Sequence, residues 1–457
     1  MVFSSVLFVF WFLPLAIGLL AIVPPRFKNA VLLGLSLVFY AWGEVRYMLI
    51  MLISIALDYT CSNAIENHRG DRKRMRRYVL ISIFGNLGML FFFKYADFVL
   101  HNVNALTGLD LPLLGLTLPL GISFYTFQTM AYTIDVYRGQ FPAERNLIDF
   151  GAFVCLFPQL IAGPIVTYGD IRLALKAKSV AFDHFGEGLS IFLSGLAMKI
   201  LLANPVGQLW DDVILLGPDR ISSTTAWLGL VAFGLQIYFD FNGYSKMAIG
   251  MGKMLGFEFP ENFNYPYLSK SFTEFWTRWH ITLGSWFKHY LYFPLGGNRK
   301  VAWMTARNLL IVWFLTGLWH GADFNFIFWG LYFFALIALE KWAIGGFLKK
   351  HTLLARFYFV IGILIGWAIF AITDLGILGA YLRVLFNFTV GAESIYLLRN
   401  YGIVLILGLA FCFPILKPLH TSARWQPALK LGLALASVLA MAYLVDSTYN
   451  PFLYFRF

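Results

Sequence analysis

Two histidines directly follow tryptophan, and both are candidates for chemistry. Trp-His occurs at residues 279–280 and 319–320, whereas 14 Trp and 8 His in 457 residues predict roughly a quarter of one occurrence by chance. The only charged or basic side chains in the apolar segment 308–339 are His320 and Asp323. A buried, neutral imidazole can accept the proton of an attacking hydroxyl near neutral pH. We therefore expect His320 to act as a general base.

Each candidate also has a purely structural interpretation. His320 could be hydrogen-bonded inside a helix bundle, and His280 could be an anchor at the membrane interface. Asp240 and Asn242 interrupt the apolar residues 236–244, where polar side chains serve either a substrate or hydrogen bonding between helices. The residue types alone leave these alternatives open.

The sequence lacks the motifs of several other mechanisms and binding functions. It has no G-x-S-x-G, no H-x-x-x-x-D and no Walker loop, so neither a serine nucleophile nor ATP-driven chemistry is supported. Cys61, Cys155 and Cys412 lie far apart, without a Cys/His cluster at metal-ligand spacing, so we expect neither a disulfide nor a metal site. The net charge of +11 comes from short basic clusters between apolar runs, a membrane-topology pattern that indicates no nucleic-acid partner.

The elements that position these residues are expected to be membrane helices. The chain is 59% hydrophobic and 13% charged, against roughly 25% charged in soluble domains. Runs such as residues 1–24 are long enough to span a bilayer. That first run lacks a basic start and a cleavage site, so we expect it to remain as a helix. The prediction is an all-α, polytopic protein in contact with membrane lipid, with residues 1–457 as a single membrane domain.

Charge sets the expected topology. Residues 68–77 contain six Lys or Arg and one Asp, so this loop should be cytoplasmic and the N-terminus outside. Segment 150–168, interrupted by Pro158 and Gly163, is expected to be re-entrant, with both ends on one side. The C-terminus should again be outside. We expect about ten full passes, at residues 3–23, 29–44, 47–65, 79–98, 116–137, 184–204, 223–252, 353–372, 400–416 and 427–446.

Two further segments are expected to carry the histidines. Segment 308–339 should turn at residues 321–323, because basic residues flank both of its ends. Thirteen residues from 308 to 320 make ~20 Å of helix against ~30 Å of hydrocarbon, which predicts His320 within the bilayer. Residues 272–293 place aromatic side chains on one face at helical spacing, which predicts an amphipathic helix at the cytoplasmic surface.

Eight motifs occur in one order between residues 118 and 330, and together they are highly specific. The chain resembles the membrane-bound O-acyltransferase family, in particular its bacterial branch of alginate O-acetylases and peptidoglycan O-acetyltransferases, with a motif-bearing core at about 118–345. The motifs are LPLGISFY (118–125), IDVYRG (134–139), FPQLIAGP (157–164), YFDFNGYS (238–245), ENFNYPY (261–267), FWTRWHI (275–281), YFPLGGNR (292–299) and TGLWHGA (316–322).

The resemblance implies a barrel-like helical fold in a bacterial inner membrane, with a central tunnel. It implies that His320 is the catalytic residue and His280 a second functional one. It also implies acetyl-CoA as a donor substrate, no permanently bound cofactor, and an extracytoplasmic SGNH-type acetyltransferase as partner. Arg299 and Lys300 are expected at the donor entrance. Residues expected to line the tunnel or substrate site are Tyr238, Asp240, Asn242, Trp279, Trp319, Asp323 and Asn325.

These observations favour an O-acyltransferase that passes acetyl across the membrane to an extracytoplasmic polysaccharide, alginate-type in the first place and peptidoglycan in the second. A transporter or flippase for a lipid-linked glycan or acyl carrier would also place Asp240 and His320 in the membrane. Such proteins often show paired halves with helices broken at matching positions, and the sequence shows no such pairing. A scaffold for a polysaccharide synthase would tolerate replacement of His320.

Overall fold

The computed structural model of the chain describes residues 1–161, 163–177, 184–299, 301–420, 422–446 and 449–451. In these residues the regular structure is helical, and a single isolated antiparallel bridge, Phe263 to Trp279, is the only β pairing. The all-α prediction is therefore confirmed. The chain forms two compact units, unit 1 with residues 1–192 and 245–260, and unit 2 with residues 193–244 and 261–457. The single membrane domain remains a prediction.

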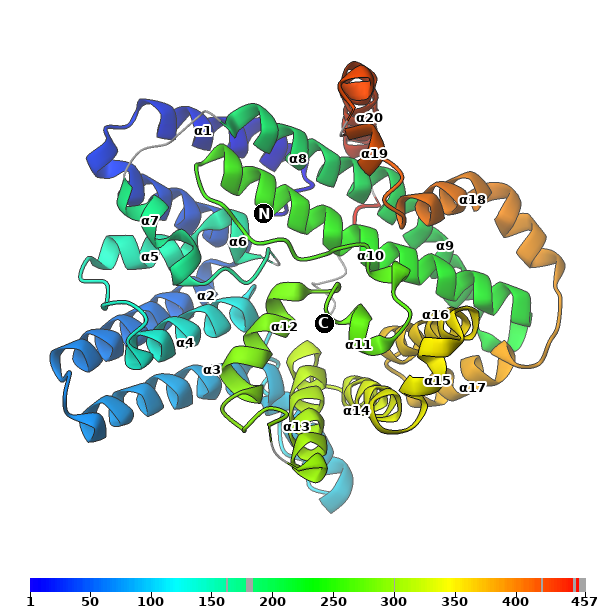
Figure 1. Cartoon of the computed structure of the whole chain (residues 1–457), viewed down its shortest axis with the longest axis horizontal. Helices are drawn as coiled ribbons and strands as arrows, with labels where there is room; N and C mark the ends of the chain where they lie inside the picture. The colour runs from blue at the N-terminus through cyan, green and yellow to red at the C-terminus, as the bar shows by residue number, and fades with distance from the viewer. Residues whose placement is uncertain (162, 178–183, 300, 421, 447–448, 452–457) are drawn as a thin grey trace. The chain divides into compact units, whose positions relative to one another are not determined.

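Unit 1 is built mainly on α2 (Lys28–Asn67) and α3 (Arg72–Thr107), shown in blue in Figure 1. Glu44 interrupts α2 with non-helical φ and ψ angles of −153° and 72°, at the junction of the two passes expected at 29–44 and 47–65. The Asp71 carboxylate starts α3 by accepting from the backbone N–H groups of Lys73 and Arg74. The other helices of unit 1 are η1 (Phe8–Phe12), α1 (Leu13–Ile22), η2 (Pro25–Phe27), α4 (Ile122–Arg138), α5 (Leu147–Cys155), α6 (Phe157–Leu160), α7 (Tyr168–Ala177), the first part of α8 (Phe185–Ala197) and the last part of α10 (Ser223–Met254).

Segment 150–168 is broken into short helices, as expected from its proline and glycine residues. It contains the end of α5, the single turn α6 and the start of α7. Residues 149–161 are all buried, so its irregular backbone is covered by protein, as the hydrocarbon region requires. The side of the membrane on which the segment begins and ends remains a prediction.

A polar cluster in unit 1 joins three of its long helices. Asp58 of α2 is fully buried. One of its carboxylate oxygens accepts from the hydroxyls of Ser82 and Thr133, and the other accepts from the Asn86 amide at 2.6 Å. Ser54 in turn donates to Asn86 at 2.8 Å. A carboxylate that would be costly in isolation is thereby supplied with donors from α3 and α4.

Unit 2 contains the segments of both Trp-His pairs. Its helix α14 packs against α13 and against α16 (Figure 1). The helices of unit 2 are the end of α8, η4 (Met198–Ala203), α9 (Asn204–Leu216), η5 (Pro218–Arg220), the first part of α10, η6 (Pro266–Leu268), α11 (Phe272–Phe275), α12 (Ile281–Phe287), η7 (Lys288–Tyr292), α13 (Ala302–His320), α14 (Phe324–Leu339), η8 (Glu340–Ile344), α15 (Gly345–Lys350), α16 (Thr352–Ala371), α17 (Leu375–Leu385), α18 (Ala392–Phe411), α19 (Lys417–His420), η9 (Ala423–Trp425) and α20 (Gln426–Asp446).

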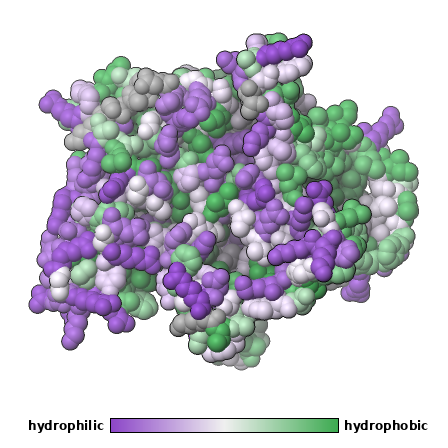
Figure 2. Space-filling model, in the orientation of Figure 1, coloured by the Kyte–Doolittle hydropathy of each residue, from purple (hydrophilic) through white to green (hydrophobic). Residues whose placement is uncertain are grey.

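The exposed surface of unit 2 is apolar where a lipid-facing helix would be. On α18, Ile403 and Ile406 are 79% and 69% exposed, and Figure 2 shows hydrophobic residues over this part of the unit. By length and composition, seven helices in the described ranges can cross a membrane, which confirms a polytopic protein. The count of ten passes and the orientation of the termini remain predictions. The candidate spans are Pro25–Asn67, Arg72–Thr107, Phe185–Leu216, Phe324–Lys350, Thr352–Ala371, Ala392–Phe411 and Ala423–Asp446.

Several boundaries differ from the expected ones. Asp211 and Asp212, which fall between the passes expected at 184–204 and 223–252, lie in α9, and α17 was not expected. Helix α13 begins at Ala302 instead of residue 308, because Arg307 continues the helix although it is charged. The 19 residues of α13 make about 28 Å, close to the ~30 Å of hydrocarbon. Helix length alone therefore no longer places His320 within the bilayer, and its depth remains a prediction.

Candidate active site

A hairpin of α13 and α14 places His320. The expected turn at residues 321–323 is confirmed, because His320 ends α13 and Asp323 is the N-cap of α14. The Asp323 carboxylate accepts from the backbone N–H of Phe324 at 2.7 Å. The two helices approach closely at Gly317 and Gly330, where a Cβ on Gly317 would collide with the backbone of α14. Small residues at this crossing fix where the turn, and His320 with it, can lie.

Aromatic rings, among them Trp319, Trp329 and Phe370, surround the His320 imidazole. Its ring centroid lies 5.0 Å from Trp319, 4.9 Å from Trp329 and 5.2 Å from Phe370, with interplanar angles of 80°, 77° and 84°. Asn325, fully buried, donates to the backbone carbonyls of residues 369 and 370, at 3.1 and 3.0 Å. The Asn325 side chain therefore holds the end of α16, and Phe370 with it, beside the half-buried His320.

His280 lies at a break in the chain and not within the continuous amphipathic helix expected at 272–293. That expectation is wrong at this point, because α11 ends at Phe275 and α12 begins at Ile281. His280 has a left-handed backbone, with φ 45° and ψ 54°. This conformation costs about 1–2 kcal/mol in a residue with a side chain. The five residues between the two helices must therefore be held in place by other contacts.

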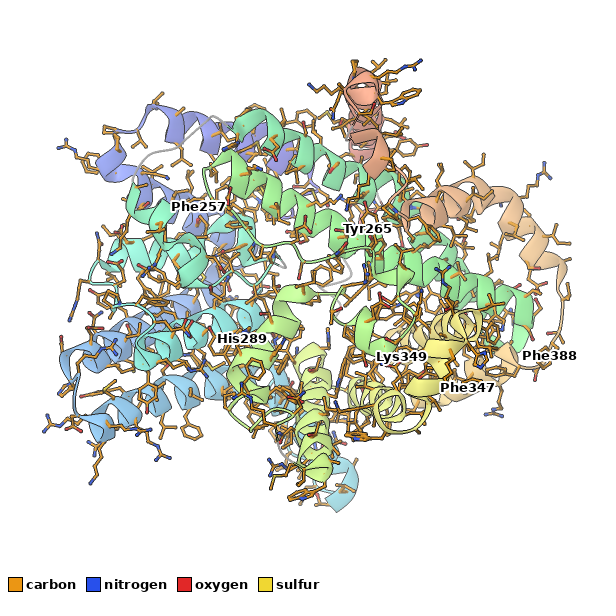
Figure 3. All side chains as sticks on the ribbon, in the orientation of Figure 1. Phe257, Tyr265, His289, Phe347, Lys349 and Phe388 are labelled. Atoms are coloured by element: carbon orange, nitrogen blue, oxygen red, sulfur yellow. The ribbon has the colours of Figure 1, made fainter. Side chains whose placement is uncertain are left out.

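Residues 262–264 provide those contacts by pairing with the chain around His280. The backbone N–H of Asn264 donates to the Arg278 carbonyl at 2.9 Å, and that of Ile281 donates to the Asn262 carbonyl at 3.0 Å. These bonds satisfy backbone groups that a continuous helix would have used. The paired segment ends at Tyr265, which is also left-handed, with φ 44°, and lies in the loop before α11 (Figure 3).

The two histidines share one aromatic neighbour. The Trp319 ring lies 6.0 Å from the His280 ring and 5.0 Å from the His320 ring. His280 is 3% exposed and also meets Phe241 of α10, edge to face at 4.8 Å. Burial lowers the pKa of the His280 imidazole to about 3, so this side chain is neutral. The structure therefore brings together the two predicted histidines and Trp319.

Trp279 and Tyr238 extend the same aromatic cluster. The two rings lie 6.2 Å apart, and Trp279 also contacts Phe263 at 5.0 Å and Trp367 at 4.9 Å. Asn242 lies one turn further along α10 and is 7% exposed. Both residues expected from the sequence to line the site are thus buried beside the segment that carries His280.

Asp240 has an ionic partner that the sequence reasoning missed. Its carboxylate lies 2.7 Å from the Lys199 ammonium, and both side chains are at most 3% exposed. Lys199 also donates to the backbone carbonyl of Pro451. Pairing compensates both buried charges, which supports a structural contribution of Asp240. The signal was available in the sequence, since Lys199 is the only charged residue in the apolar run 189–210.

Comparison with known proteins decides the family. The sequence model of the membrane-bound O-acyltransferase family matches residues 141–381. The chain belongs to this family. It is 37% identical to a probable alginate O-acetylase of Pseudomonas putida over the full length of both chains. It is 41% identical to one of Pseudomonas aeruginosa, over 85% of this chain and 75% of the relative. A peptidoglycan O-acetyltransferase of Helicobacter pylori is 35% identical, over 72% and 68%.

Membership of the membrane-bound O-acyltransferase family makes the chain a multi-pass membrane enzyme that transfers an acyl group to oxygen. The recognition made from its motifs is confirmed. The roles of the individual site residues, the barrel shape and the tunnel remain predictions. Among the residues that the structure describes, no group of three or more His, Cys, Asp or Glu side chains could hold a metal ion.

The loop before α13 contains the residues expected at the donor entrance. Arg299 is exposed, whereas Lys300 lies outside the described residues. The fully buried Asn308 donates to the carbonyls of Leu295 and Gly297, at 3.2 and 3.0 Å. It thereby ties the loop to α13. The sequence analysis gave Asn308 no role. An amide side chain at the start of an apolar run could have indicated one.

Proposed function

We propose that this family member takes an acetyl group from cytoplasmic acetyl-CoA and passes it across a bacterial inner membrane, for O-acetylation of an extracytoplasmic polysaccharide. An alginate-type exopolysaccharide is the first choice and peptidoglycan the second, after the names of the relatives. The observation that carries the proposal is the placement of His320 at the turn of the α13–α14 hairpin, with the ring of Trp319 in contact with both His320 and His280.

In this proposal His320 acts as the general base. The acceptor oxygen attacks the acetyl carbonyl carbon while the imidazole takes the hydroxyl proton. The carbon–sulfur bond then breaks, and the CoA sulfur leaves with a proton returned by the imidazolium. One thioester and one hydroxyl thus give one ester and one thiol. The rings of Trp319, Trp329 and Phe370 around the imidazole would limit the access of water, which would otherwise compete as acceptor.

The donor and the final acceptor are assigned to opposite sides of the membrane. Arg299 and Lys300 would offer positive charge to the phosphates of coenzyme A. An extracytoplasmic partner of the SGNH type would place the acetyl group on the glycan. Acceptor choice would then rest with the partner and not with this chain.

The test uses purified chain in lipid nanodiscs, labelled acetyl-CoA supplied on one side, and the partner with a glycan on the other. Wild-type protein should transfer label, and His320→Gln should not, because glutamine cannot accept the proton. His101→Gln replaces an exposed histidine and serves as control. Near wild-type transfer by a folded His320→Gln protein would contradict the general-base role. Label that crosses the membrane only as intact acetyl-CoA would instead favour a transporter.

A further inference from the structure

Asn262 is the side chain hydrogen-bonded to His280, and its amide is oriented by the surrounding donors. Its Oδ1 atom lies 3.3 Å from the backbone N–H nitrogen of Thr282, 2.9 Å from the Thr282 hydroxyl and 3.1 Å from His280 Nδ1. A backbone N–H can only donate, so the amide atom that faces it must be the oxygen and not the nitrogen. This fixes the orientation of the amide.

The orientation of the amide decides the tautomer of His280. An amide oxygen only accepts, so the contact with His280 requires that Nδ1 carries a hydrogen. Burial lowers the pKa of this imidazole, so the ring is neutral and carries one N–H. The lone pair therefore lies on Nε2. In this tautomer Nε2 accepts hydrogen bonds and cannot donate them.

The amide keeps this orientation at a cost. Asn262 is 1% exposed, and within the described ranges its Nδ2 atom has no hydrogen-bond partner. A buried N–H without an acceptor is unfavourable and calls for an explanation. The explanation offered by the geometry is that Oδ1, held by Thr282 and by the backbone pairing of residues 262 and 281, serves His280.

We propose that Asn262 is a positioning residue that holds His280 as the Nδ1–H tautomer, so that His280 Nε2 accepts a hydrogen bond from an O–H or N–H group of the bound substrate. The inference rests on the proposed acyl transfer and deepens it. It excludes His280 as the donor that stabilises the negative oxygen of the transition state. It assigns His280 instead to holding a donor group of the substrate while His320 takes the proton that is transferred.

The test compares Asn262→Leu and Asn262→Asp with Asn264→Ala. Asn264 is exposed and lies two residues further along the same segment, so its replacement should leave transfer unchanged. Asn262→Leu should lower the turnover number roughly tenfold or more, as expected when a partner that orients an imidazole is lost, with an unchanged Michaelis constant for acetyl-CoA. Asn262→Asp keeps an acceptor for Nδ1–H and should keep most activity at neutral and alkaline pH.

The acid side of the pH profile separates positioning from packing. A carboxylate beside His280 raises its pKa, so Nε2 becomes protonated at a higher pH, and Asn262→Asp should lose activity on acidification earlier than wild type. The groups that face His280 include Phe241 from α10, Trp319 from α13 and Asn262 itself. An unmoved acid side in the Asn262→Asp protein would contradict the inference.

Two further measurements complete the test. In a His280→Ala background, Asn262→Leu should cause no additional loss of turnover, because its effect acts through His280. A full additional loss would mean that Asn262 contributes through packing alone and would contradict the inference. Nitrogen NMR of histidine-labelled wild type and His280→Gln identifies the His280 signals, and an Nε2–H tautomer would overturn the inference. If wild type transfers no acetyl at all, the proposed function fails, while the tautomer measurement still decides the role of Asn262.

Discussion

Two buried polar clusters differ in how their hydrogen bonds are used. In unit 1, the Asp58 carboxylate accepts three hydrogen bonds, from Ser82, Asn86 and Thr133. In unit 2, the surroundings of the histidines include buried atoms without a hydrogen-bond partner among the described residues, namely Asn262 Nδ2, Asn325 Oδ1 and Trp329 Nε1. A satisfied cluster stabilises a fold, whereas an incompletely satisfied one retains donors and acceptors for a substrate.

Unpaired atoms alone do not mark a functional site. Gln128, in unit 1, is 1% exposed and also has unpaired amide atoms within the described residues. What distinguishes the atoms in unit 2 is the neighbouring imidazoles, since Trp329 contacts His320 and Asn262 contacts His280. We therefore expect substitutions beside the two histidines of unit 2 to affect transfer, and substitutions at Asp58 to affect stability.

The largest effect is expected for His320. His320→Ala should lower the rate of transfer by ~10² to 10⁴, which is the contribution of a positioned base. The thermal unfolding midpoint in detergent should stay close to that of wild type, because a half-buried side chain is removed. If the unfolding midpoint of His320→Ala fell together with its activity, the contrast between the two clusters would be contradicted.

Asp58→Ala should show the opposite behaviour. Removing the carboxylate leaves the donors of Ser82, Asn86 and Thr133 unpaired in the interior, at a cost of about 2–4 kcal/mol in unfolding free energy. Activity per folded molecule should be retained. Asp110→Ala, at an exposed position, is the matched control in thermal unfolding. Equal midpoints for the two variants would show that the cluster contributes nothing to stability.

Trp329→Phe removes one N–H group and keeps a ring beside His320. Because no hydrogen bond within the described residues is lost, stability should change little. If the indole N–H binds substrate, the turnover number should fall about three- to tenfold, the worth of one hydrogen bond. Steady-state kinetics of transfer, with Trp303→Phe at an exposed position as control, measures the effect. Unchanged kinetics would remove Trp329 from the substrate-binding groups.

The smallest effect is expected at the loop before α13. Arg299→Ala combined with Lys300→Ala should raise the Michaelis constant for acetyl-CoA about two- to fivefold, since exposed charges contribute little each. The maximal rate should be preserved. Raising the salt concentration should reduce the difference from wild type. An unchanged donor dependence would leave both residues as topology signals only.

The sequence predicted features whose causes are local. The turn at residues 321–323 follows from a Gly-Ala-Asp run between two apolar segments, and the break near Glu44 follows from charge within an apolar run. The break at His280 could not be predicted in this way. Its cause is the pairing with residues 262–264, more than ten positions earlier in the chain, and helical periodicity across 272–293 contains no trace of that partner.

The same distinction applies to the site. Motif resemblance and the rarity of Trp-His selected both histidines, and the structure places both of them beside Trp319. The partners Asn262, Asn308 and Lys199 were missed. Lys199 and Asn308 are polar residues next to or within apolar runs, but the group that each of them binds is a property of the folded chain. Asn262 lay inside a recognised motif, but only its distance to His280 Nδ1 shows what its amide does.

The close contact of Gly317 with Gly330 has a consequence for how the enzyme tolerates variation. Neither glycine has a side chain that can react, yet a methyl group at either position would meet the backbone of the facing helix. Natural or introduced alanine at these positions would displace the end of α13, where His320 lies, and the turn that follows it. A mutational scan scored by acetylation alone would therefore rank both glycines as sensitive as the histidines, although the glycines determine only the position of the His320 imidazole.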